Sequence, residues 1–457
     1  MNLLPQLEII RQYFLSGATQ SIEFRKLQLQ KLKKAILTYE EELNEALYKD
    51  LKKSKEEVWI TETGMVLSEI SYFLKQIEAL ATPQKTGTNL LNQPGNSFIM
   101  SEPLGVVLIV APWNYPFQLS LVPLIGAIAA GNCMVLKPSE FAPATESIIQ
   151  KIIAETFAPQ YVSCATGDGA AVIPAMFEKF RFDHVFYTGS TSVGKIIYKQ
   201  AAEQLIPVTL ELGGKSPCIV SANANLKLAA KRIAIGKFLN AGQTCIAPDY
   251  VLVHQSVKDK FLQLLKDTIR AFYSEHPVTS YDYGRIINKK QFDRLMGYLE
   301  TARVIWGGTH NEDILYISPT IIEAPGTDDP IMNEEIFGPL LPVIGYSDNA
   351  FALEVIRRNP NPLAFYVFTG NTSEADEWLQ KVPSGGACVN AVAMHYLNKN
   401  LPFGGRGNSG TGRYHGKYSF DTFSHQKAVL KAATWPDLPM AYPSFKGRLG
   451  LLKRLIK

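Results

Sequence analysis

Cys245 lies in the segment FLNAGQTCIAPDY, residues 238–250, where small and polar residues precede it and a proline follows. The glycine at position 242 predicts that a helix ends near residues 240–242 and that the next residues form a loop with exposed backbone N–H groups. Such donors stabilise a thiolate, and the N–H group of Cys245 itself would reach an oxygen on a carbon bound to the sulfur. Cys245 is therefore a candidate nucleophile, although most free cysteines are inert core residues.

Three further segments combine glycine, proline or asparagine with a side chain that could take part in catalysis. They are APWNYPF (111–117), LELGGKSP (210–217) and EEIFGPLLP (334–342). Asn114 could donate a hydrogen bond to a reacting oxygen, although asparagine before Tyr-Pro also suits an ordinary turn. Glu211 lies among apolar residues, where an unpaired carboxylate is costly, and this favours a functional role over a simple ion pair. Glu335 suits either a ligand contact or the start of a turn at Gly338-Pro339.

The run DHVFYTGSTSVGKIIYKQAA, residues 183–202, is typical of a strand, a Gly/Ser turn and a helix. That layout presents backbone N–H groups to a phosphate. The spacing from Gly189 to Gly194 lacks the middle glycine of the GxGxxG pattern, and a tight turn needs glycine for geometric reasons alone. A cofactor loop and a structural turn are equally good interpretations of this run by itself.

Parallel sheets are expected to position these segments. The first 80 or so residues have helical periodicity, with Leu32, Ile36, Tyr39, Leu43 and Leu47 at steps of three and four. From residue 101 onward, apolar runs alternate with helical patterns, which predicts an α/β fold with ligands at the carboxyl ends of its strands. The predicted strands include residues 104–110, 133–136, 183–187, 218–220, 250–254, 316–322 and 364–368.

Composition excludes several classes of protein. The chain has 457 residues, 46% of them hydrophobic, and a net charge of +4, which suits two or three globular domains and argues against nucleic-acid binding. Its five cysteines are scattered and contain no CxxC pair, so neither a disulfide framework nor a zinc site is indicated. The N-terminus has no signal-peptide pattern, and residues 119–131 are too short for a membrane span. We expect a cytoplasmic protein without a bound metal.

With its motifs in this order, the chain resembles the aldehyde dehydrogenase superfamily, and most closely the class three branch that acts on fatty and aromatic aldehydes. The resemblance runs from about residue 10 to residue 430. The motifs that carry it are WNYP (113–116), KPSE (137–140), YTGS (187–190), LELGGK (210–215), GQTC (242–245), EEIFGP (334–339) and PFGG (402–405). The segments 241–250 and 402–425 are similar to the class three form in particular.

The resemblance implies that Cys245 is the nucleophile, Glu211 the general base and Asn114 the oxyanion donor, in an enzyme that oxidises an aldehyde to its acid. It implies NAD or NADP as cofactor, since members of the branch with Glu140 accept both. A glutamate near the ribose 2′ position otherwise favours NAD, because it repels a phosphate. The implied cofactor-binding residues are Trp113, Lys137, Glu140, Gly189, Ser190, Gly194, Glu335 and Phe337.

The resemblance also implies that Tyr115, Thr244 and His415 lie near the aldehyde tunnel, where the first two suit an apolar or aromatic chain. A structural histidine is an equally good interpretation of His415. The sequence departs from the class three pattern at Ala391, where the pattern has Asp, and through residues 391–400.

The domain organisation implied by the resemblance is an aldehyde dehydrogenase-like fold in a homodimer. A Rossmann-like cofactor domain would comprise residues 1–82 and 106–209, and a second α/β catalytic domain residues 210–410. A bridging and oligomerisation element would comprise residues 83–105 and 411–435.

Residues 436–457 form a basic tail. From Tyr442 it carries five basic residues and no acidic one, with Leu449, Leu452 and Ile456 at helical steps. Such a segment can lie weakly on the inner membrane surface, but a docking helix or a frayed tail is the more economical interpretation.

Two alternative functions stay open at this point. An acylating enzyme would release the thioester to coenzyme A, but it would need no water-activating Glu211. A non-catalytic binding protein would have no need of Cys245, Glu211 and Asn114 together.

Overall fold

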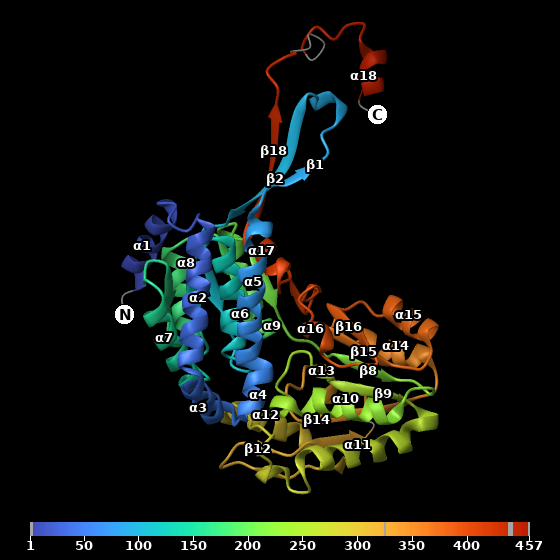
Figure 1. Cartoon of the computed structure of the whole chain (residues 1–457). Coiled ribbons are helices and arrows are strands. Elements are labelled where there is room, and N and C mark those ends of the chain that lie inside the picture. The colour runs from blue at the N-terminus through green and yellow to red at the C-terminus, as the bar shows by residue number, and fades with distance from the viewer. Residues whose placement is uncertain (1–2, 324–325, 437–441, 456–457) are drawn as a thin grey trace.

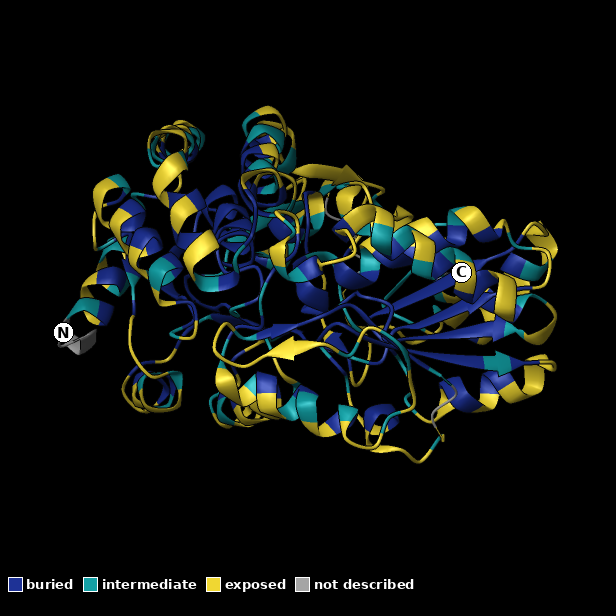
Figure 2. Cartoon of the chain, turned by 90° about the horizontal axis from the view of Figure 1, so that it is seen from below, coloured by how far each residue is buried: buried dark blue, intermediate teal, exposed yellow. Residues whose placement is uncertain are grey.

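The computed structural model describes residues 3–323, 326–436 and 442–455. Within them the strands form two large sheets, a three-stranded sheet and a short two-stranded ribbon (Figure 1). Helices cover the large sheets, whose strands are the most buried part of the molecule (Figure 2). The alternation of strands and helices confirms the predicted α/β class.

The N-terminal region is helical, as its periodicity predicts. Leu32, Ile36, Leu43 and Leu47 are fully buried, whereas Tyr39 is only partly buried and caps the junction between two helices. The elements are α1 (Leu3–Leu15), α2 (Ile22–Thr38), α3 (Glu40–Leu51), α4 (Lys55–Val58), the π-helical turn η1 (Trp59–Thr63) and α5 (Gly64–Ala81).

The first large sheet has the order β17-β7-β6-β3-β4-β5 and is parallel except for β17. The chain runs from β3 to β4 and β5 on one side and then returns to β6 and β7 on the other, so the topological switch point lies between β3 and β6. The strands are β3 (Val106–Val110), β4 (Cys133–Lys137), β5 (Val162–Cys164), β6 (His184–Thr188), β7 (Val208–Glu211) and β17 (Gly410–Thr411). The intervening helices are α6 (Gln118–Ala130), α7 (Pro143–Thr156), α8 (Gly169–Lys179) and α9 (Thr191–Glu203).

The second large sheet has the order β10-β13-β14-β9-β8-β15-β16. The run 316–322, predicted as one strand, is interrupted at Pro319, which has no N–H group for a sheet ladder, and its halves join different sheets. The strands are β8 (Pro217–Val220), β9 (Tyr250–His254), β10 (Val304–Trp306), β13 (Thr320–Glu323), β14 (Leu340–Tyr346), β15 (Ala364–Phe368) and β16 (Gly386–Val389). The ribbon pairs β11 (His310–Asn311) with β12 (Tyr316–Ile317).

Helices and short helical turns connect these strands. They are α10 (Leu226–Phe238), η3 (Leu239–Gly242), η4 (Gln255–Val257), α11 (Lys258–Tyr273), η5 (Pro277–Thr279), α12 (Lys289–Leu299), α13 (Pro330–Asn333), α14 (Asn349–Arg357), α15 (Thr372–Lys381), α16 (Met394–Leu397) and α17 (Lys417–Thr422).

The three-stranded antiparallel sheet forms an arm that projects from the body (Figure 1). Here β2 pairs along its whole length with β18, two segments that lie far apart in the sequence. The arm comprises β1 (Gln84–Thr86), η2 (Leu90–Asn92), β2 (Gly95–Pro103) and β18 (Ser424–Ala432), and α18 (Leu449–Leu455) lies beyond its distal end. The division of the chain into domains stays a prediction.

Candidate active site

The carboxyl edge of the six-stranded sheet gathers four of the predicted side chains. Strands β3, β6 and β7 run parallel, so their carboxyl ends meet at one edge. Trp113 and Asn114 follow β3, Ser190 follows β6, and Glu211 is the last residue of β7. This edge is where the parallel topology predicts a ligand site.

A cavity of about 410 Å³ lies at this edge and reaches the second sheet. Cys245 and Glu335 enter it from loops that precede β9 and β14. The prediction that ligand-binding loops follow strand carboxyl ends is therefore correct for the six-stranded sheet and wrong for the seven-stranded one. The lining residues are Pro112, Trp113, Asn114, Leu119, Thr188, Gly189, Ser190, Thr191, Ser192, Glu211, Leu212, Gly213, Cys245, Gln291, Arg294, Glu334, Glu335 and Phe337.

A tight turn presents Cys245 to the cavity. Helix α10 ends at Phe238, and Asn240, Ala241 and Gly242 then adopt left-handed backbone angles, with φ of 52°, 50° and 76°. A side chain at position 242 would place its Cβ 2.3 Å from the carbonyl oxygen of Gly338, so only glycine lets the loop that carries Glu335 pass this closely.

Cys245 differs from the other four free cysteines in its setting. Those four lie on strands of the two large sheets, whereas Cys245 is partly exposed and lines the cavity. Burial raises the pKa of its thiol, and the carboxyl groups of Glu335 and Glu211 raise it further. The N–H groups of Cys245 and Ile246 oppose this effect on the pKa, so they point at the sulfur from the start of the following loop.

Asn114 is fixed from both ends. Its side-chain Nδ2 donates to the carbonyl oxygen of Gln243, two residues before Cys245, at 3.0 Å. Its own carbonyl oxygen accepts from Lys53 Nζ at 2.9 Å and from Asn240 Nδ2 at 2.8 Å. The amide therefore has one orientation beside the loop of Cys245.

Glu211 is buried with only 3% of its surface exposed. Neither carboxyl oxygen has a hydrogen-bond partner among the residues that the structure describes. Burial alone accounts for its pKa, which lies well above the ordinary value. An unsatisfied carboxyl group in a cavity wall is rare in a folded protein and indicates a functional group.

Glu335 lies against the glycine pair that links the two sheets. A Cβ on Gly213 would come within 1.8 Å of its Oε2, and the N–H group of Gly214 donates to its carboxylate. Burial and the charge of Asp249 raise the pKa of Glu335 to about 8, although the Gly214 N–H, Lys215 and Arg294 counteract part of this effect.

Phe337 completes the wall opposite Trp113. It has a left-handed backbone with φ of 48°, and its ring packs edge-on against the Trp113 ring at a centroid distance of 5.3 Å. Phenylalanine rarely adopts a positive φ, so Phe337 is a strained residue in the wall of the cavity.

The Gly/Ser turn after β6 leads into α9, whose N-terminal residues line the cavity. The Oγ of Ser190 accepts a hydrogen bond from Val193 N at 3.4 Å, and Gly189 lies so near Tyr187 that a Cβ there would be 2.3 Å from its hydroxyl. Glycine is required at position 194 for a different reason, because a Cβ there would lie 2.6 Å from Leu212 Cδ2. Gly194 serves close packing, and it does not line the cavity.

Lys137 and Glu140 lie outside the cavity lining but pair with each other. Their Nζ and Oε2 atoms are 2.9 Å apart, and Glu140 Oε1 accepts from Gly169 N at 2.8 Å. Burial opposes ionisation of Glu140, but these two donors outweigh it and lower the pKa of the carboxyl group. Glu140 is therefore a fixed anion at the carboxyl end of β4.

The three residues predicted to contact substrate lie outside the cavity lining. The hydroxyls of Tyr115 and Thr244 are hydrogen-bonded at 2.6 Å. His415 is buried against the rings of Tyr414 and Tyr396, at centroid distances of 4.4 and 4.5 Å. Burial lowers the pKa of His415 to about 3, so its ring is neutral at physiological pH.

Several residues at or near the cavity were not predicted from the sequence. Gln291 and Arg294 line the cavity from α12, where they sit on an ordinary amphipathic helix with no motif around them. Buried charges at Lys53, Glu57 and Glu62 lie in a lysine- and glutamate-rich stretch that looks like a solvated helix face in the sequence.

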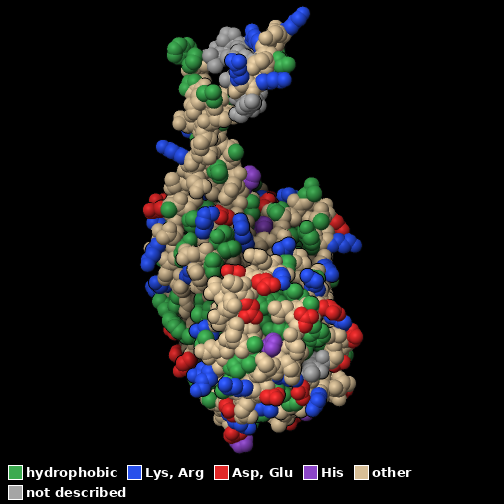
Figure 3. Space-filling model, turned by 90° about the vertical axis from the view of Figure 1, so that its right-hand side faces the viewer, with side chains coloured by type: hydrophobic (Ala, Val, Ile, Leu, Met, Phe, Trp, Pro, Cys, Tyr) green, Lys and Arg blue, Asp and Glu red, His purple; other side chains and the backbone are tan. Residues whose placement is uncertain are grey.

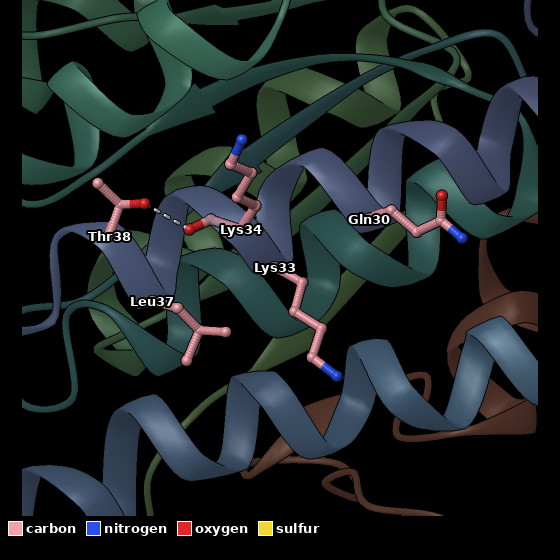
Figure 4. A pocket seen from close by; sticks show the side chains of 5 residues that line it. All are labelled: Gln30, Lys33, Lys34, Leu37 and Thr38. Carbon is pink, nitrogen blue, oxygen red and sulfur yellow. Dashed lines mark hydrogen bonds between the residues drawn. The ribbon is translucent and has the colours of Figure 1, made fainter.

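A second hollow, on the surface of α2, has no comparable chemistry. Its lining residues all come from one helix, and their side chains diverge (Figure 4). Thr38 Oγ1 donates to the Lys34 carbonyl at 3.0 Å within the helix itself. The cavity at Cys245 is therefore the candidate active site.

Comparison with known proteins agrees with this geometry. Residues 11–429 match the sequence profile of the aldehyde dehydrogenase family. The chain belongs to this family. It is 45% identical over 460 residues to the 4,4'-diaponeurosporen-aldehyde dehydrogenase of Staphylococcus aureus, covering 100% of both chains. It is 44% identical to the rat aldehyde dehydrogenase family 3 member B1, covering 97% of this chain and 95% of the relative.

Solved structures of aldehyde dehydrogenases have the same fold. The substrate-bound state of Staphylococcus aureus AldH superposes with a TM-score of 0.98 at 44% identity, covering 100% of both chains. An indole-3-acetaldehyde dehydrogenase in complex with NAD⁺ superposes with a TM-score of 0.85 at 28% identity, over 94% of this chain and 88% of that one. The predicted resemblance to class three and the predicted fold are confirmed, and the chain is an oxidoreductase that acts on aldehydes.

Proposed function

We propose that this aldehyde dehydrogenase oxidises an apolar aldehyde to its carboxylic acid with NAD or NADP, through a thioester on Cys245 that water hydrolyses. The convergence of Cys245, Asn114 and Glu211 on one cavity carries the proposal. It brings together a nucleophile, a fixed hydrogen-bond donor and an unsatisfied carboxyl group from three distant parts of the sequence.

Cys245 gives up its thiol proton to water and attacks the aldehyde carbon as the thiolate, because that carbon must become tetrahedral before it can release hydride. The resulting alkoxide needs donors that are already in place. One hydrogen of the Asn114 amide holds the Gln243 carbonyl, which leaves the other for the alkoxide, and the Cys245 N–H supplies a second donor.

We infer that a bound dinucleotide would extend from the cavity to the carboxyl end of β4. The open N-terminus of α9 at Ser190 suits a phosphate, and the fixed Glu140 carboxylate at the end of β4 suits the adenosine ribose, as Lys137 does beside it. Glu335 and Phe337 would hold the nicotinamide ribose, on the side of the cavity nearest Cys245. The bound nicotinamide supplies the hydride acceptor.

Glu211 activates the water that hydrolyses the thioester. A carboxylate whose pKa is raised by burial is a stronger base than an ordinary exposed glutamate, so it accepts a proton from water more readily. Release to coenzyme A would require no such group, which favours hydrolysis over an acylating enzyme.

The substrate side of the site suits an apolar or aromatic chain. Tyr115 lies beside Thr244, next to the nucleophile, and the neutral His415 is surrounded by aromatic rings. The Staphylococcus aureus relative is named for 4,4'-diaponeurosporen-aldehyde, so this aldehyde belongs among the substrates to be tested.

A kinetic panel tests the proposal. Medium-chain, long-chain and aromatic aldehydes are each assayed with NAD and with NADP, with and without coenzyme A, and the products are identified by mass spectrometry. We expect reduced cofactor and free acid in equal amounts, without dependence on coenzyme A. An acyl-coenzyme A product would show an acylating enzyme, and no reduced cofactor with any aldehyde would indicate a binding protein.

We also propose that the arm joins two copies of the chain into a homodimer, by analogy with the family, and that residues 210–410 act as the catalytic domain beside the cofactor domain and bridging arm. Exposed apolar side chains on and beyond β18 support the first point, with Trp435 82% exposed and Leu430 45% exposed. Analytical ultracentrifugation tests it, and a monomer at micromolar concentration would contradict it.

For the tail we propose a weak peripheral contact with anionic membrane. Lys446, Arg448, Lys453 and Arg454 lie beyond the arm with exposed Phe445, and Figure 3 shows basic side chains at this distal end. Ile456 and Lys457, predicted as part of this segment, lie outside the described residues. In residues 3–323, 326–436 and 442–455, no helix has the length and apolarity of a membrane span.

Deleting residues 442–457 tests the contact. The shortened chain should sediment less with phosphatidylglycerol liposomes while it keeps its aldehyde activity. Equal sedimentation of both forms would contradict the membrane contact and leave a docking role for the tail.

A further inference from the structure

Three charged side chains behind the active site are buried, although none of them touches the cavity. Lys53, Glu57 and Glu62 come from the short stretch that includes α4 and η1, and their exposed fractions are 1%, 4% and 0%. Burying an ion costs several kcal/mol unless partners surround it, so such groups persist where they hold something in place. The π-helical turn at Glu62 is of a kind found often at functional sites.

Lys53 and Glu62 hold the loop that carries the oxyanion donor. Lys53 Nζ donates to Glu62 Oε1 at 2.6 Å and to the Asn114 carbonyl at 2.9 Å. The other Glu62 oxygen accepts from the backbone N–H groups of Phe117 and Gln118 at 3.1 and 2.8 Å. The pair therefore holds residues 114–118 at both ends by hydrogen bonds.

Lys53 also underlies the next residue of that loop. Its Nζ lies 4.0 Å from the centroid of the Tyr115 ring. The Tyr115 hydroxyl is hydrogen-bonded to Thr244, the neighbour of Cys245. A single ammonium group thus contacts the loop of the donor twice and reaches Thr244, the residue before the nucleophile, through the Tyr115 side chain.

Glu57 holds the turn that precedes the nucleophile. It accepts a hydrogen bond from Asn240 N at 3.0 Å, at the residue where the backbone first becomes left-handed. Asn240 in turn donates from its side chain to the Asn114 carbonyl at 2.8 Å. The Asn114 carbonyl therefore accepts hydrogen bonds from both sides. Lys53 donates to it from the stretch that holds the donor loop, and Asn240 donates to it from the turn before the nucleophile.

We propose that Lys53, Glu57 and Glu62 are positioning residues that fix the separation between the Asn114 amide and the sulfur of Cys245. The proposal rests on the proposed function, in which these two groups act on the same carbon. Segment 113–118 follows β3 of the first sheet and segment 240–245 precedes β9 of the second, and residues 53–62 contact both. Neutral hydrogen bonds would hold the loops less firmly, because charge-assisted ones are roughly twice as strong.

Lys53→Met tests the proposal most directly. The methionine fills similar volume but removes both donations, so the Asn114 carbonyl loses its link to Glu62, while Phe117 N and Gln118 N stay bonded to Glu62. Because a misplacement of about 1 Å can cost roughly a hundredfold in rate, we expect the first-turnover rate of NADH formation to fall by about tenfold to a hundredfold. The KM for NAD should change by less than about threefold, since these residues lie away from the cofactor wall.

Lys258→Met is the matched control. Lys258, the first residue of α11, forms an ion pair at 3.1 Å with Glu323 of β13, so its partner belongs to the second sheet and to neither loop. It should keep the wild-type turnover rate. The conservative variant Lys53→Arg, which restores the charge, should recover part of the lost rate.

Glu57→Leu keeps the proposal falsifiable if Lys53→Met does not fold. It removes only the acceptor for Asn240 N and should slow the first turnover by about tenfold. Rates are divided by the folded fraction, measured from the thermal transition of each variant.

Wild-type rates per folded molecule in either folded variant would overturn the proposal and leave these charges a purely structural role. A wild-type enzyme that forms no NADH from any aldehyde would instead contradict the proposed function itself.

Discussion

Two buried carboxyl groups flank the active site and differ in how they are satisfied. Glu62 lies behind the cavity with Lys53 and two backbone N–H groups on its oxygens, whereas Glu211 lines the cavity and has no hydrogen-bond partner in the described ranges of the chain. Burial raises the pKa of both, but partners counteract the rise only for Glu62. A buried carboxyl group with hydrogen-bond partners on both oxygens, such as Glu62, holds other residues in place. A buried carboxyl group without such partners, such as Glu211, can exchange a proton.

Glu211 and Cys245 also differ in how the structure positions them in the active site. Glu211 is the last residue of β7, so the sheet register fixes it without any side-chain support. Cys245 enters from a left-handed turn in front of β9, and that turn depends on side chains such as Glu57. Groups at strand ends come with the fold, whereas groups on loops need added anchors.

The largest expected effect comes from removing the sulfur of Cys245, the one sulfur among the residues that line the cavity. Cys245→Ala should reduce NADH formation to the uncatalysed background, because no other group in the cavity can form the thioester. NAD should still bind, as titration by fluorescence would show. Retained turnover would mean that a different side chain is the nucleophile.

The second prediction compares the two carboxyl groups by stability. Glu62→Leu should lower the free energy of unfolding by about 3 to 5 kcal/mol, since it leaves Lys53 buried without its counterion. Glu211→Leu should raise the same quantity by about 1 kcal/mol, because an unsatisfied polar group is replaced by an apolar one. Urea denaturation measures both, and equal destabilisation by the two variants would remove the contrast between them.

The smallest effect concerns the pH dependence of stability. Burial raises the pKa of Glu57 to about 7, above the value of about 4.5 for an unfolded chain, although Lys53 and the Asn240 N–H counteract part of the rise. The folded protein therefore binds this proton more tightly, so the contribution of Glu57 to stability falls as pH rises from about 4.5 to about 7. Relative to wild type, Glu57→Gln should gain up to about 3 kcal/mol between pH 4.5 and pH 8.

Denaturation curves for the wild type and Glu57→Gln at both pH values give this difference. A constant offset between the two proteins across the range would show that Glu57 has an ordinary pKa in the folded state.

Much of the fold follows from local sequence patterns. The apolar runs at β3, β6, β9 and β15 became strands because their side chains are buried on both faces of parallel sheets. The helical end before Cys245 came earlier than glycine alone predicts, at Phe238, because three successive left-handed residues follow it. Glycine signals show that a turn exists, but they do not show where it begins.

The candidate site was predictable where a reactive residue lies in a motif, as for Cys245, Glu211, Asn114 and Glu335. Lys53 was not predictable, because its role depends on a carbonyl 61 residues away in the sequence. Only the folded chain shows that a lysine in a highly charged helical stretch is buried.

Glu211 is proposed to act after the thioester has formed on Cys245, and the variant Glu211→Gln separates this role from one in the formation of the thioester. Mixed with excess aldehyde and NAD, this variant should release one equivalent of NADH per active site and then stall, with steady turnover reduced by about a hundredfold or more. Mass spectrometry should find the acyl group on the peptide that contains Cys245. Steady turnover at the wild-type rate, with no acyl group on that peptide, would show that Glu211 has no role in hydrolysis of the thioester.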